Sequence, residues 1–467
     1  MEKAVFHLFK TYKNKYLYDV NTNALMLVSD ECFEQIVKYN DTGIVNDAVE
    51  KLQGQGYLRK RNNFIMENPE VDGLKYSLEN DLGTMALQVT QSCNLRCKYC
   101  VYSGNYENRE HSSLRMSRET AYKAIDYLVE HSANSENLHL GFYGGEPLLE
   151  FELIKDCVEY IRKATNKEII FNITTNCVLL DEEKIDFLYQ NDFRVTISLD
   201  GPANIHDANR VKLDNSGSFS NVITAIQVIK KKYPEYLGKI NINAVIDISK
   251  GFKDVYDFFI SNEEVRDIYT TYNFQSNDYA INRKVMSEEF ISQYMLEQFK
   301  YLMAMMEKKG VYTRSNIFDA NIKQLIERVH KVIMYKTFEV SKEHHSGPCV
   351  PGKHRLFINV SGCFYPCERV NELSDPMQIG NLDTGFILEK VQNLLNLGKL
   401  TETECRNCWA FRFCTICAAK ADEQGQLSRD RKLENCKLTR DTIHRLLIDY
   451  CLLRELGFDF DTDYEME

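Results

Sequence analysis

Cysteine is the residue type whose number and spacing in this chain most directly suggest chemistry. The sequence has 467 residues and 15 cysteines, and three of these lie together as Cys93-x3-Cys97-x2-Cys100. In a large chain, cysteines clustered in this way indicate metal or redox chemistry rather than a disulfide framework. Three thiolates on one tight loop can hold three irons of a cubane [4Fe–4S] cluster and leave the fourth iron open. The alternatives are a zinc knuckle or a structural disulfide, although structural zinc usually takes four ligands.

A second and larger group of cysteines lies near the C-terminal end. It consists of Cys349, Cys363, Cys367, Cys405, Cys408, Cys414, Cys417 and Cys436. The region 346–440 has few long periodic segments, and such a region can build its core around metal clusters. A pair of zinc ribbons is the alternative interpretation.

Short glycine-rich or polar motifs follow three apolar runs, at the points where strands are expected to end. They occupy residues 142–147 (Phe-Tyr-Gly-Gly-Glu-Pro), 173–176 (Ile-Thr-Thr-Asn) and 197–202 (Ile-Ser-Leu-Asp-Gly-Pro). The paired glycines let the backbone approach a ligand closely. Asn176 and Ser198 have turn capping as their alternative role.

The elements that position these motifs alternate between strands and helices from residue 84 onward. The expected strands are 85–90, 138–143, 169–174, 194–199, 240–246 and 268–274. Six β–α units in series predict a parallel sheet with right-handed crossovers. Six are too few for an eight-stranded barrel, so we expect an open partial barrel with ligands at the carboxyl ends of its strands. The cysteine loop and the three motifs should then face one cavity.

The N-terminal residues are expected to form a small unit of their own. Residues 3–66 predict three short strands, two helices and a final strand that begins at Tyr57-Leu58. Residues 67–82 are polar, contain Pro69 and Gly73, and are typical of a linker.

Charge and hydropathy argue against two classes of partner. The chain has 57 Lys and Arg against 68 Asp and Glu, a net charge of −11 at pH 7. Binding to a phosphate backbone needs a basic surface, so we expect no nucleic-acid partner. The start of the chain has no apolar stretch of secretory type, and no run of about 18 apolar residues occurs. The sequence therefore predicts a cytoplasmic protein with no membrane partner.

The Cys-x3-Cys-x2-Cys loop after the first strand of a β/α series resembles the radical S-adenosylmethionine (SAM) superfamily. The strand-end motifs resemble its subfamily of anaerobic sulfatase maturases and peptide-modifying enzymes. The resemblance implies that Cys93, Cys97 and Cys100 hold a cluster whose open iron binds SAM, and that Arg210 pairs with the SAM carboxylate. The cofactor-binding residues that it implies are Tyr99, Gly144, Gly145, Glu146, Asn176, Ser198, Asp200 and Arg210. Cys177 stands where the family's Thr-Thr-Asn-Gly turn has glycine, so this turn must tolerate a side chain.

The C-terminal array resembles the SPASM domain, with Cys349, Gly362 and Cys367 fitting the first part of its pattern. The spacing Cys414-x2-Cys417 is one residue shorter than usual. The resemblance implies two auxiliary [4Fe–4S] clusters. The outer one would be closed by Cys405, Cys408, Cys414 and Cys436. The inner one would be held by Cys349, Cys367 and Cys417, and either Cys363, His344 or His345 completes it or an open iron faces the substrate.

Taken together, the chain resembles maturases of ribosomally synthesised and modified peptides (RiPPs), above all those of Cys-rich peptides. Segments 349–353 and 364–369 carry that likeness. In the order of its elements the N-terminal unit resembles the RiPP recognition element, a winged-helix-like fold that adds a precursor's leader to a sheet edge. An adaptor or dimerisation domain is the alternative.

The expected architecture is α/β: a partial (β/α)6 radical SAM barrel, an N-terminal winged-helix-like α+β domain and a C-terminal cysteine-rich iron–sulfur (SPASM) domain. The expected divisions are as follows: recognition element and linker 1–80, barrel 81–310, helical bridge 311–345, SPASM domain 346–440, and C-terminal helix or tail 441–467.

The resemblance also implies a reaction, with SAM and three [4Fe–4S] clusters as cofactors and a flavodoxin- or ferredoxin-type protein as reductant. A 5′-deoxyadenosyl radical would abstract a side-chain hydrogen from the precursor peptide, and a crosslink would form. A thioether to a substrate cysteine is the first expectation, with Glu368 as candidate base.

Three other functions stay open. They are carbon–carbon closure such as a cyclopropane, maturation of a sulfatase by oxidation of Cys or Ser, and non-catalytic electron transfer. The N-terminal unit argues against a sulfatase target, and the Gly-Gly-Glu-Pro segment argues against an electron carrier.

Overall fold

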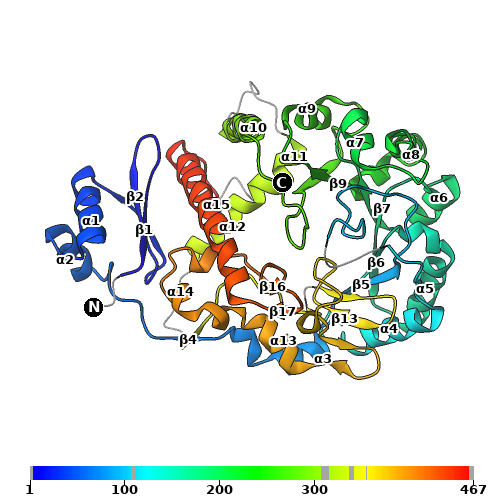
Figure 1. Cartoon of the computed structure of the whole chain (residues 1–467), viewed down its shortest axis with the longest axis horizontal. Coiled ribbons are helices and arrows are strands. Elements are labelled where there is room, and N and C mark those ends of the chain that lie inside the picture. The colour runs from blue at the N-terminus through cyan, green and yellow to red at the C-terminus, as the bar shows by residue number, and fades with distance from the viewer. Residues whose placement is uncertain (1–3, 107–110, 307–314, 336–340, 354, 462–467) are drawn as a thin grey trace.

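The structure is a computed structural model that describes residues 4–106, 111–306, 315–335, 341–353 and 355–461. Three parts follow one another across Figure 1. A small N-terminal unit lies at the left, the barrel at the right, and the cysteine-rich C-terminal region between them.

The barrel contains the six parallel strands that the sequence predicts. They are β5 (Thr84–Thr90), β6 (Asn137–Gly144), β7 (Glu168–Thr175), β8 (Arg194–Ser198), β9 (Ile240–Ile246) and β10 (Tyr269–Phe274), neighbours in that order. The crossover helices are α4 (Arg118–Glu130), α5 (Phe151–Ala164), α6 (Glu182–Gln190), α7 (Ala203–Asn209), α8 (Phe219–Lys232) and α9 (Lys253–Ser261). They lie on the outer face of the curved sheet (Figure 1). The apolar core of this sheet confirms the prediction of a partial barrel.

The sheet continues beyond its first strand, which the sequence patterns do not predict. Strand β12 (Leu356–Ile358) pairs in parallel with β5, and β13 (Cys363–Tyr365), β14 (Gly380–Asn381) and β15 (Gly385–Phe386) follow in antiparallel order. All three β12 side chains are fully buried. A three-residue strand carries too short a pattern to be recognised, and pairing with β5 is what stabilises it. The cysteine-rich region therefore shares one sheet with the barrel.

The N-terminal unit contains an antiparallel sheet of β1 (Phe6–Lys10), β2 (Lys15–Asp19) and β3 (Ala24–Val28), followed by α1 (Asp30–Thr42) and α2 (Asp47–Gly54). The strand expected at Tyr57-Leu58 is wrong. Leu58 has a left-handed backbone with φ 49°, and its N–H donates to Asp19 Oδ1 at 3.0 Å instead of to a strand. A short strand forms later, where β4 (Ile65–Met66) pairs with β11 (Lys342–Glu343).

The polar segment 67–82 is more than a linker. It contains the helix α3 (Leu74–Asn80), whose Leu74 and Leu78 join the main core together with Leu82. The two leucines are one helical turn apart, so a single apolar stripe is enough to hold the helix in place. This segment is therefore part of the fold.

The C-terminal region ends in the 27-residue helix α15 (Arg429–Glu455). The expected boundary at residue 440 falls inside this helix, so Cys436 belongs to it. The remaining elements are α10 (Glu288–Met306), α11 (Asn316–Phe318), α12 (Gln324–Met334), α13 (Leu388–Leu395), α14 (Glu402–Arg406), β16 (Asp422–Glu423) and β17 (Gln426–Leu427). Residues 311–314 and 336–340 of the expected helical bridge lie outside the described residues. Among the described helices, none is both long and apolar enough to cross a membrane.

The N-terminal unit is docked on the C-terminal region rather than tethered. His7 on β1 stacks on Trp409 and its Nε2 is 2.8 Å from His444 Nδ1 on α15. Asn23 donates through Nδ2 to the carbonyl oxygens of Val332 and Tyr335, at 2.7 and 2.9 Å. These contacts explain why α15 runs alongside the N-terminal sheet in Figure 1.

The cysteine loop is positioned by close backbone contact with the end of β6. Gly145 N donates to Thr90 O at 2.9 Å, and Glu146 N donates to Ser92 O at 3.0 Å. A Cβ atom on Gly145 would lie 2.1 Å from Ser92 O, and one on Gly144 would lie 2.1 Å from Thr90 O. Both glycines are therefore required by the approach of this chain segment to the residues before Cys93.

We expect Gly145→Ala to lower the free energy of unfolding by about 3 kcal/mol, the upper end of overpacking costs, because its Cβ meets backbone that cannot rotate away. Denaturant unfolding of the anaerobically reconstituted protein measures the change. Gly238→Ala is the matched control, since a Cβ there has nothing within 4 Å. Equal stability of the two variants would contradict the steric argument.

Candidate active site

Three cysteines that follow β5 form a compact group at the carboxyl edge of the barrel. All 15 cysteines are free thiols. Burial raises the pKa of Cys93 to about 12, and the charges of Cys97 and Cys100 add to the rise. Leu95 N donates to Cys93 Sγ at 3.4 Å, and Tyr102 N to Cys100 Sγ at 3.5 Å. Three thiols that share a buried site need a cationic group to become thiolates together, which is the chemistry of a metal cluster.

Glu146 and Asn176 join the ends of β6 and β7 to this loop. The Glu146 carboxylate accepts hydrogen bonds from Thr175 Oγ1 and Asn176 N, both at 2.8 Å, and from Leu148 N at 3.1 Å. Burial raises the pKa of Glu146 to about 7. Asn176 Nδ2 donates to Asn94 Oδ1 at 2.8 Å and lies 3.8 Å from Cys93 Sγ. The structure thus brings residues 142–147 and 173–176 to the cysteine loop, as the sequence predicts.

Arg210 is paired with Asp200 in the structure. Its Nε and Nη2 donate to Asp200 Oδ2 and Oδ1 at 3.0 and 3.1 Å, and the Tyr99 hydroxyl donates to the same carboxylate. Tyr99 is half-buried, and desolvation raises its pKa well above the usual value. Arg210 and Asp200 therefore form a buried ion pair. Through Tyr99 this pair holds the cysteine loop to the end of β8.

One residue of this network was missed from the sequence. His206 Nδ1 accepts from Asp200 N at 3.3 Å, and its Nε2 is 2.9 Å from Ser218 Oγ. Burial lowers the pKa of His206 to about 4, so the ring is neutral at neutral pH. The available signal was its place in the turn after Asp200. The neighbouring Ser198 is 9% exposed at the end of β8, and Cys177 has φ 62°, so its turn does carry a side chain in the left-handed region.

The C-terminal cysteines separate into two groups, recognised by which thiol charges act on one another. Burial raises the pKa of Cys349, and the charge of Cys417 adds to the rise. Burial likewise raises the pKa of Cys367 to about 11, with Glu368 and Cys417 adding to it. These are the three cysteines that the SPASM resemblance assigns to the inner cluster.

Four of the remaining five cysteines, all except Cys363, form the second group. Burial raises the pKa of Cys414 to about 12, with contributions from Cys408 and Cys405. It also raises the pKa of Cys436, again with contributions from Cys405 and Cys408. This group matches the set expected for the outer cluster.

Neither Cys363 nor the histidine pair lies with the inner three. Cys363 begins β13, where Gln378 Nε2 donates to its sulfur at 3.4 Å, and the charge that acts on its thiol is Glu372. His344 Nε2 accepts from Gly398 N at 2.6 Å. Burial lowers the pKa of both histidines, and the charge of Lys432 adds to the lowering. Because Lys432 contacts Cys405, the histidine pair lies towards the outer group. His345 Nε2 is buried and has no hydrogen-bond partner.

Thiol spacing bears on the zinc alternatives. Within the described ranges, no three His, Cys, Asp or Glu side chains converge closely enough for a single metal ion. A cubane distributes its irons over the corners of a cube, so its ligands lie farther apart than those of one zinc ion.

Glu368, the candidate base, is paired with an arginine. Arg355 Nη1 donates to both of its carboxylate oxygens, at 2.7 and 2.9 Å. The charge of Arg355 also acts on Cys349 and Cys367. The ion pair therefore lies beside the inner group of cysteines.

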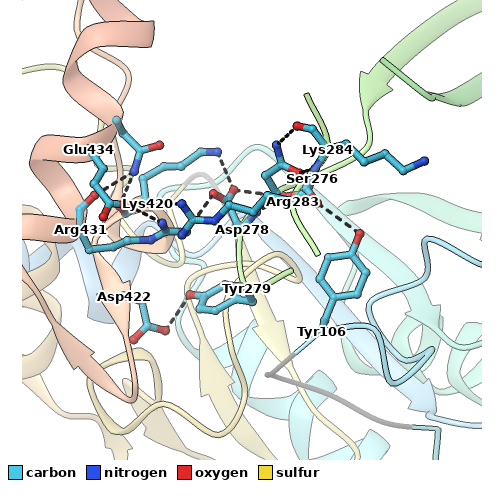
Figure 2. A network of polar contacts seen from close by, with 12 residues as sticks. Tyr106, Ser276, Asp278, Tyr279, Arg283, Lys284, Lys420, Asp422, Arg431 and Glu434 are labelled. Atoms are coloured by element: carbon cyan, nitrogen blue, oxygen red, sulfur yellow. Dashed lines mark hydrogen bonds and ion pairs between the residues drawn. The ribbon is translucent and has the colours of Figure 1, made fainter. Parts of the chain in front are cut away.

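The loop after β10 contacts both the segment that follows the cysteine loop and the C-terminal region (Figure 2). Tyr279 donates its hydroxyl to Asp422 Oδ2 at 2.7 Å, and Lys420 Nζ donates to Asp278 Oδ2 at 2.5 Å. Tyr106, which follows the cysteine loop, donates to Ser276 O at 3.2 Å. This loop therefore ties the barrel edge to the region that carries the outer cysteines.

The chain is similar to known proteins. The family model described as "Radical SAM superfamily" matches residues 87–259. The cysteine-type anaerobic sulfatase-maturating enzyme of Clostridium perfringens (strain ATCC 13124) is 26% identical over 350 residues, covering 71% of this chain and 87% of that protein. The radical SAM cyclopropyl synthase TigE of Paramaledivibacter caminithermalis is 25% identical over 248 residues, half of each chain.

A solved structure agrees with these matches. The structure titled "Native anSMEcpe with bound AdoMet" aligns with a TM-score of 0.58 and 23% identity, covering 79% of this chain and 99% of that one. At that identity the likeness supports the shared fold. The chain therefore contains a radical SAM domain and is related to the anaerobic sulfatase-maturating enzymes.

Proposed function

We propose that this protein is a radical SAM maturase that forms a crosslink, a cysteine thioether, in a ribosomally synthesised precursor peptide. The observation that carries the proposal is the division of ten cysteines into groups of three, three and four, with the first group at the carboxyl edge of the radical SAM domain. One group is suited to SAM cleavage, and two are suited to electron transfer and substrate binding.

A radical SAM domain implies SAM and a [4Fe–4S] cluster as cofactors. Cys93, Cys97 and Cys100 would hold that cluster, which together with SAM supplies a 5′-deoxyadenosyl radical able to abstract a side-chain hydrogen. Leu95 N and Tyr102 N are placed to stabilise the thiolates, because each donates to a sulfur. Gly144, Gly145 and Ser198 line the strand ends beside the loop, where SAM would lie.

The remaining residues of this edge keep the loop in position. Glu146 and Asn176 connect two strand ends to it, and the Asp200–Arg210 pair with Tyr99 connects the third. Arg210 is nearly buried against Asp200. In the loaded enzyme, Arg210 would contact the SAM carboxylate while it keeps its pair with Asp200.

The inner group would hold a cluster with one iron free of protein ligands. Cys349, Cys367 and Cys417 supply three thiolates, and Cys363 and the histidine pair have partners or neighbours elsewhere. A substrate cysteine is suited to the fourth position because thiolate is the preferred ligand of such clusters. Binding there would position the sulfur for bond formation. Glu368 is the candidate base, held beside Cys367 by its pair with Arg355.

The outer group would hold a fully ligated cluster that takes the electron onward. Its four cysteines are Cys405, Cys408, Cys414 and Cys436. A flavodoxin- or ferredoxin-type protein is the reductant that this chemistry needs. Both C-terminal clusters would be [4Fe–4S], making three in all.

The N-terminal unit would bind the leader of the precursor. Strand β3 is an edge of the three-stranded sheet, and in the described part of the chain only β2 pairs with it. An extended leader can add there as a fourth strand. Because the unit is docked on α12 and α15, a leader bound at β3 would have a defined position relative to the clusters.

Two relatives give specific reasons to keep a second function. One is a sulfatase-maturating enzyme and the other a cyclopropyl synthase, so oxidation of a single residue and carbon–carbon closure are the competing reactions. Mass spectrometry separates them: a thioether or a cyclopropane each removes two hydrogens, whereas oxidation of a cysteine to formylglycine replaces its sulfur by oxygen. Of the two closures, only the thioether requires the substrate cysteine. A precursor with that cysteine changed to alanine and still modified would exclude the thioether.

We expect about twelve irons per chain after anaerobic reconstitution, the content of three cubanes. Changing Cys93, Cys97 and Cys100 together to alanine should remove about four of them and all SAM cleavage, because no other group lies at the SAM edge. Iron assay and chromatography of 5′-deoxyadenosine measure both. Cys157→Ala is the control, a buried cysteine outside all three groups. Tightly bound zinc under strict anoxia would contradict the assignment.

Cys363→Ala should keep the full iron content, whereas Cys417→Ala should lose about four irons, the content of one cubane. The reason is that the charge of Cys417 acts on the thiols of Cys349 and Cys367, whereas the Cys363 sulfur accepts a hydrogen bond from Gln378. Iron assay and electron paramagnetic resonance (EPR) spectra report the result. If Cys363→Ala lost a cluster, the open iron would be excluded and carbon-centred closure favoured.

Leu27→Lys should weaken leader binding about tenfold or more, because a lysine on an edge strand opposes the addition of another strand. Leu27 is 63% exposed on β3. Fluorescence anisotropy with a labelled leader from the short reading frame beside this gene measures the affinity. SAM cleavage without peptide should not change. Tyr12→Lys, at a 98% exposed turn between β1 and β2, is the control; equal effects of both variants would refute the role of the edge.

A further inference from the structure

Lys432 is a buried lysine in an unusual environment. Its side chain belongs to a residue that is 1% exposed, in the first turn of α15. Its Nζ donates to Thr401 Oγ1 at 2.7 Å, to Leu397 O at 3.1 Å and to Cys405 Sγ at 3.6 Å. Within the described chain, none of these three partners is a carboxylate. The lysine therefore has neutral oxygens and one cysteine sulfur around it.

Such a position is unfavourable for a cation in two ways. A buried ammonium without a paired anion loses its hydration and gains little in return. The first turn of a helix is also the positive end of the helix dipole, which disfavours lysine there. Something negative must therefore offset the charge in the working protein.

The group that can do so is the set of outer cysteines. Cys405 is in direct contact with Nζ. Cys436 lies one turn further along α15, and its Sγ is 3.7 Å from the backbone carbonyl oxygen of Lys432. The ammonium thus contacts one outer thiol directly, and the same residue lies against a second. Arg431, the preceding residue, is directed elsewhere, to Glu434 at 2.7 Å.

We propose that Lys432 is a positioning residue for the outer auxiliary cluster: its ammonium donates a hydrogen bond to the Cys405 sulfur and raises the reduction potential of that cluster. The inference rests on the proposed function, since it needs a cluster on these cysteines. A cubane with four thiolates is anionic and becomes more so when it accepts one electron. Net charge and hydrogen bonds to the sulfurs are among the factors that set its potential. A fixed positive charge stabilises the reduced form more than the oxidised form.

Lys432 differs from the cation that pairs beside the inner group. Arg355 is paired with Glu368, whereas the hydrogen-bond partners of Lys432 are two neutral oxygens and a cysteine sulfur.

The test is a potentiometric titration with dithionite and mediators, followed by EPR. The protein carries Cys93→Ala, Cys97→Ala and Cys100→Ala, so that only the two auxiliary clusters contribute. Lys432→Met removes the charge and keeps a chain of similar shape. Reduction of one of the two clusters should become at least tenfold less favourable. Its midpoint potential should therefore fall by about 59 mV or more, the value for a one-electron couple. The other midpoint should not move.

Two further variants separate charge from structure. Lys437 is exposed on the same helix, next to Cys436. Its variant Lys437→Met should leave both midpoint potentials unchanged. Lys432→Arg keeps the charge and should keep the cluster and a midpoint close to the parent. If Lys432→Met loses the cluster and Lys432→Arg keeps it, the proposal is also supported.

Two results would overturn it. One is an unchanged midpoint in Lys432→Met with both clusters present. The other is equal loss of the cluster in Lys432→Met and Lys432→Arg, since size rather than charge would then decide. Failure of the proposed function looks different: the parent protein itself would contain one auxiliary cluster or none by iron assay, before any lysine is changed.

Discussion

Burial of many thiols close together is the constraint on which the rest of this structure depends. A thiolate in a low-dielectric site is costly, and two or three side by side repel each other. The chain lowers that cost with backbone N–H donors to Cys93 and Cys100 and with the buried Lys432 at Cys405. These contacts reduce the cost without removing it. The three groups of cysteines are therefore suited to iron–sulfur clusters, whose iron–sulfide cores are cationic.

The same constraint explains why the cysteine-rich region needs the barrel. Its strands are two or three residues long, and short strands have little stability of their own. Pairing of β12 with β5 attaches these short strands to a stable sheet, because β5 is already held by β6 and the crossover helices. Cys93 follows β5 and Cys367 follows β13. One continuous sheet therefore places the first and inner groups of cysteines relative to each other.

Long periodic segments of the sequence were sufficient to predict the barrel, since its strands and helices are stabilised by the same apolar patterns that identify them. The grouping of cysteines also followed from spacing together with family resemblance. Elements that are stabilised by contacts with residues far away in the sequence could not be predicted from local patterns. Leu58 bonds to Asp19 instead of extending a strand, and β12 exists through β5. The Asp200–Arg210 pair was likewise missed, because one-dimensional spacing does not say whether an arginine meets a ligand or a nearby carboxylate.

The docking of the N-terminal unit has a consequence for how a bound peptide would be sensed. Arg412 lies two residues before Cys414, donates to Val20 O at the end of β2, and pairs with Glu343 at 3.0 Å. Glu343 also pairs with Arg61, which follows the N-terminal helices. A shift of the β1–β3 sheet therefore cannot occur without moving the backbone next to an outer cysteine. Because these two arginines share one half-buried carboxylate, we expect the unit and the outer group to move as one body. Leader binding at β3 would then act on the position of the peptide, while the clusters keep their surroundings.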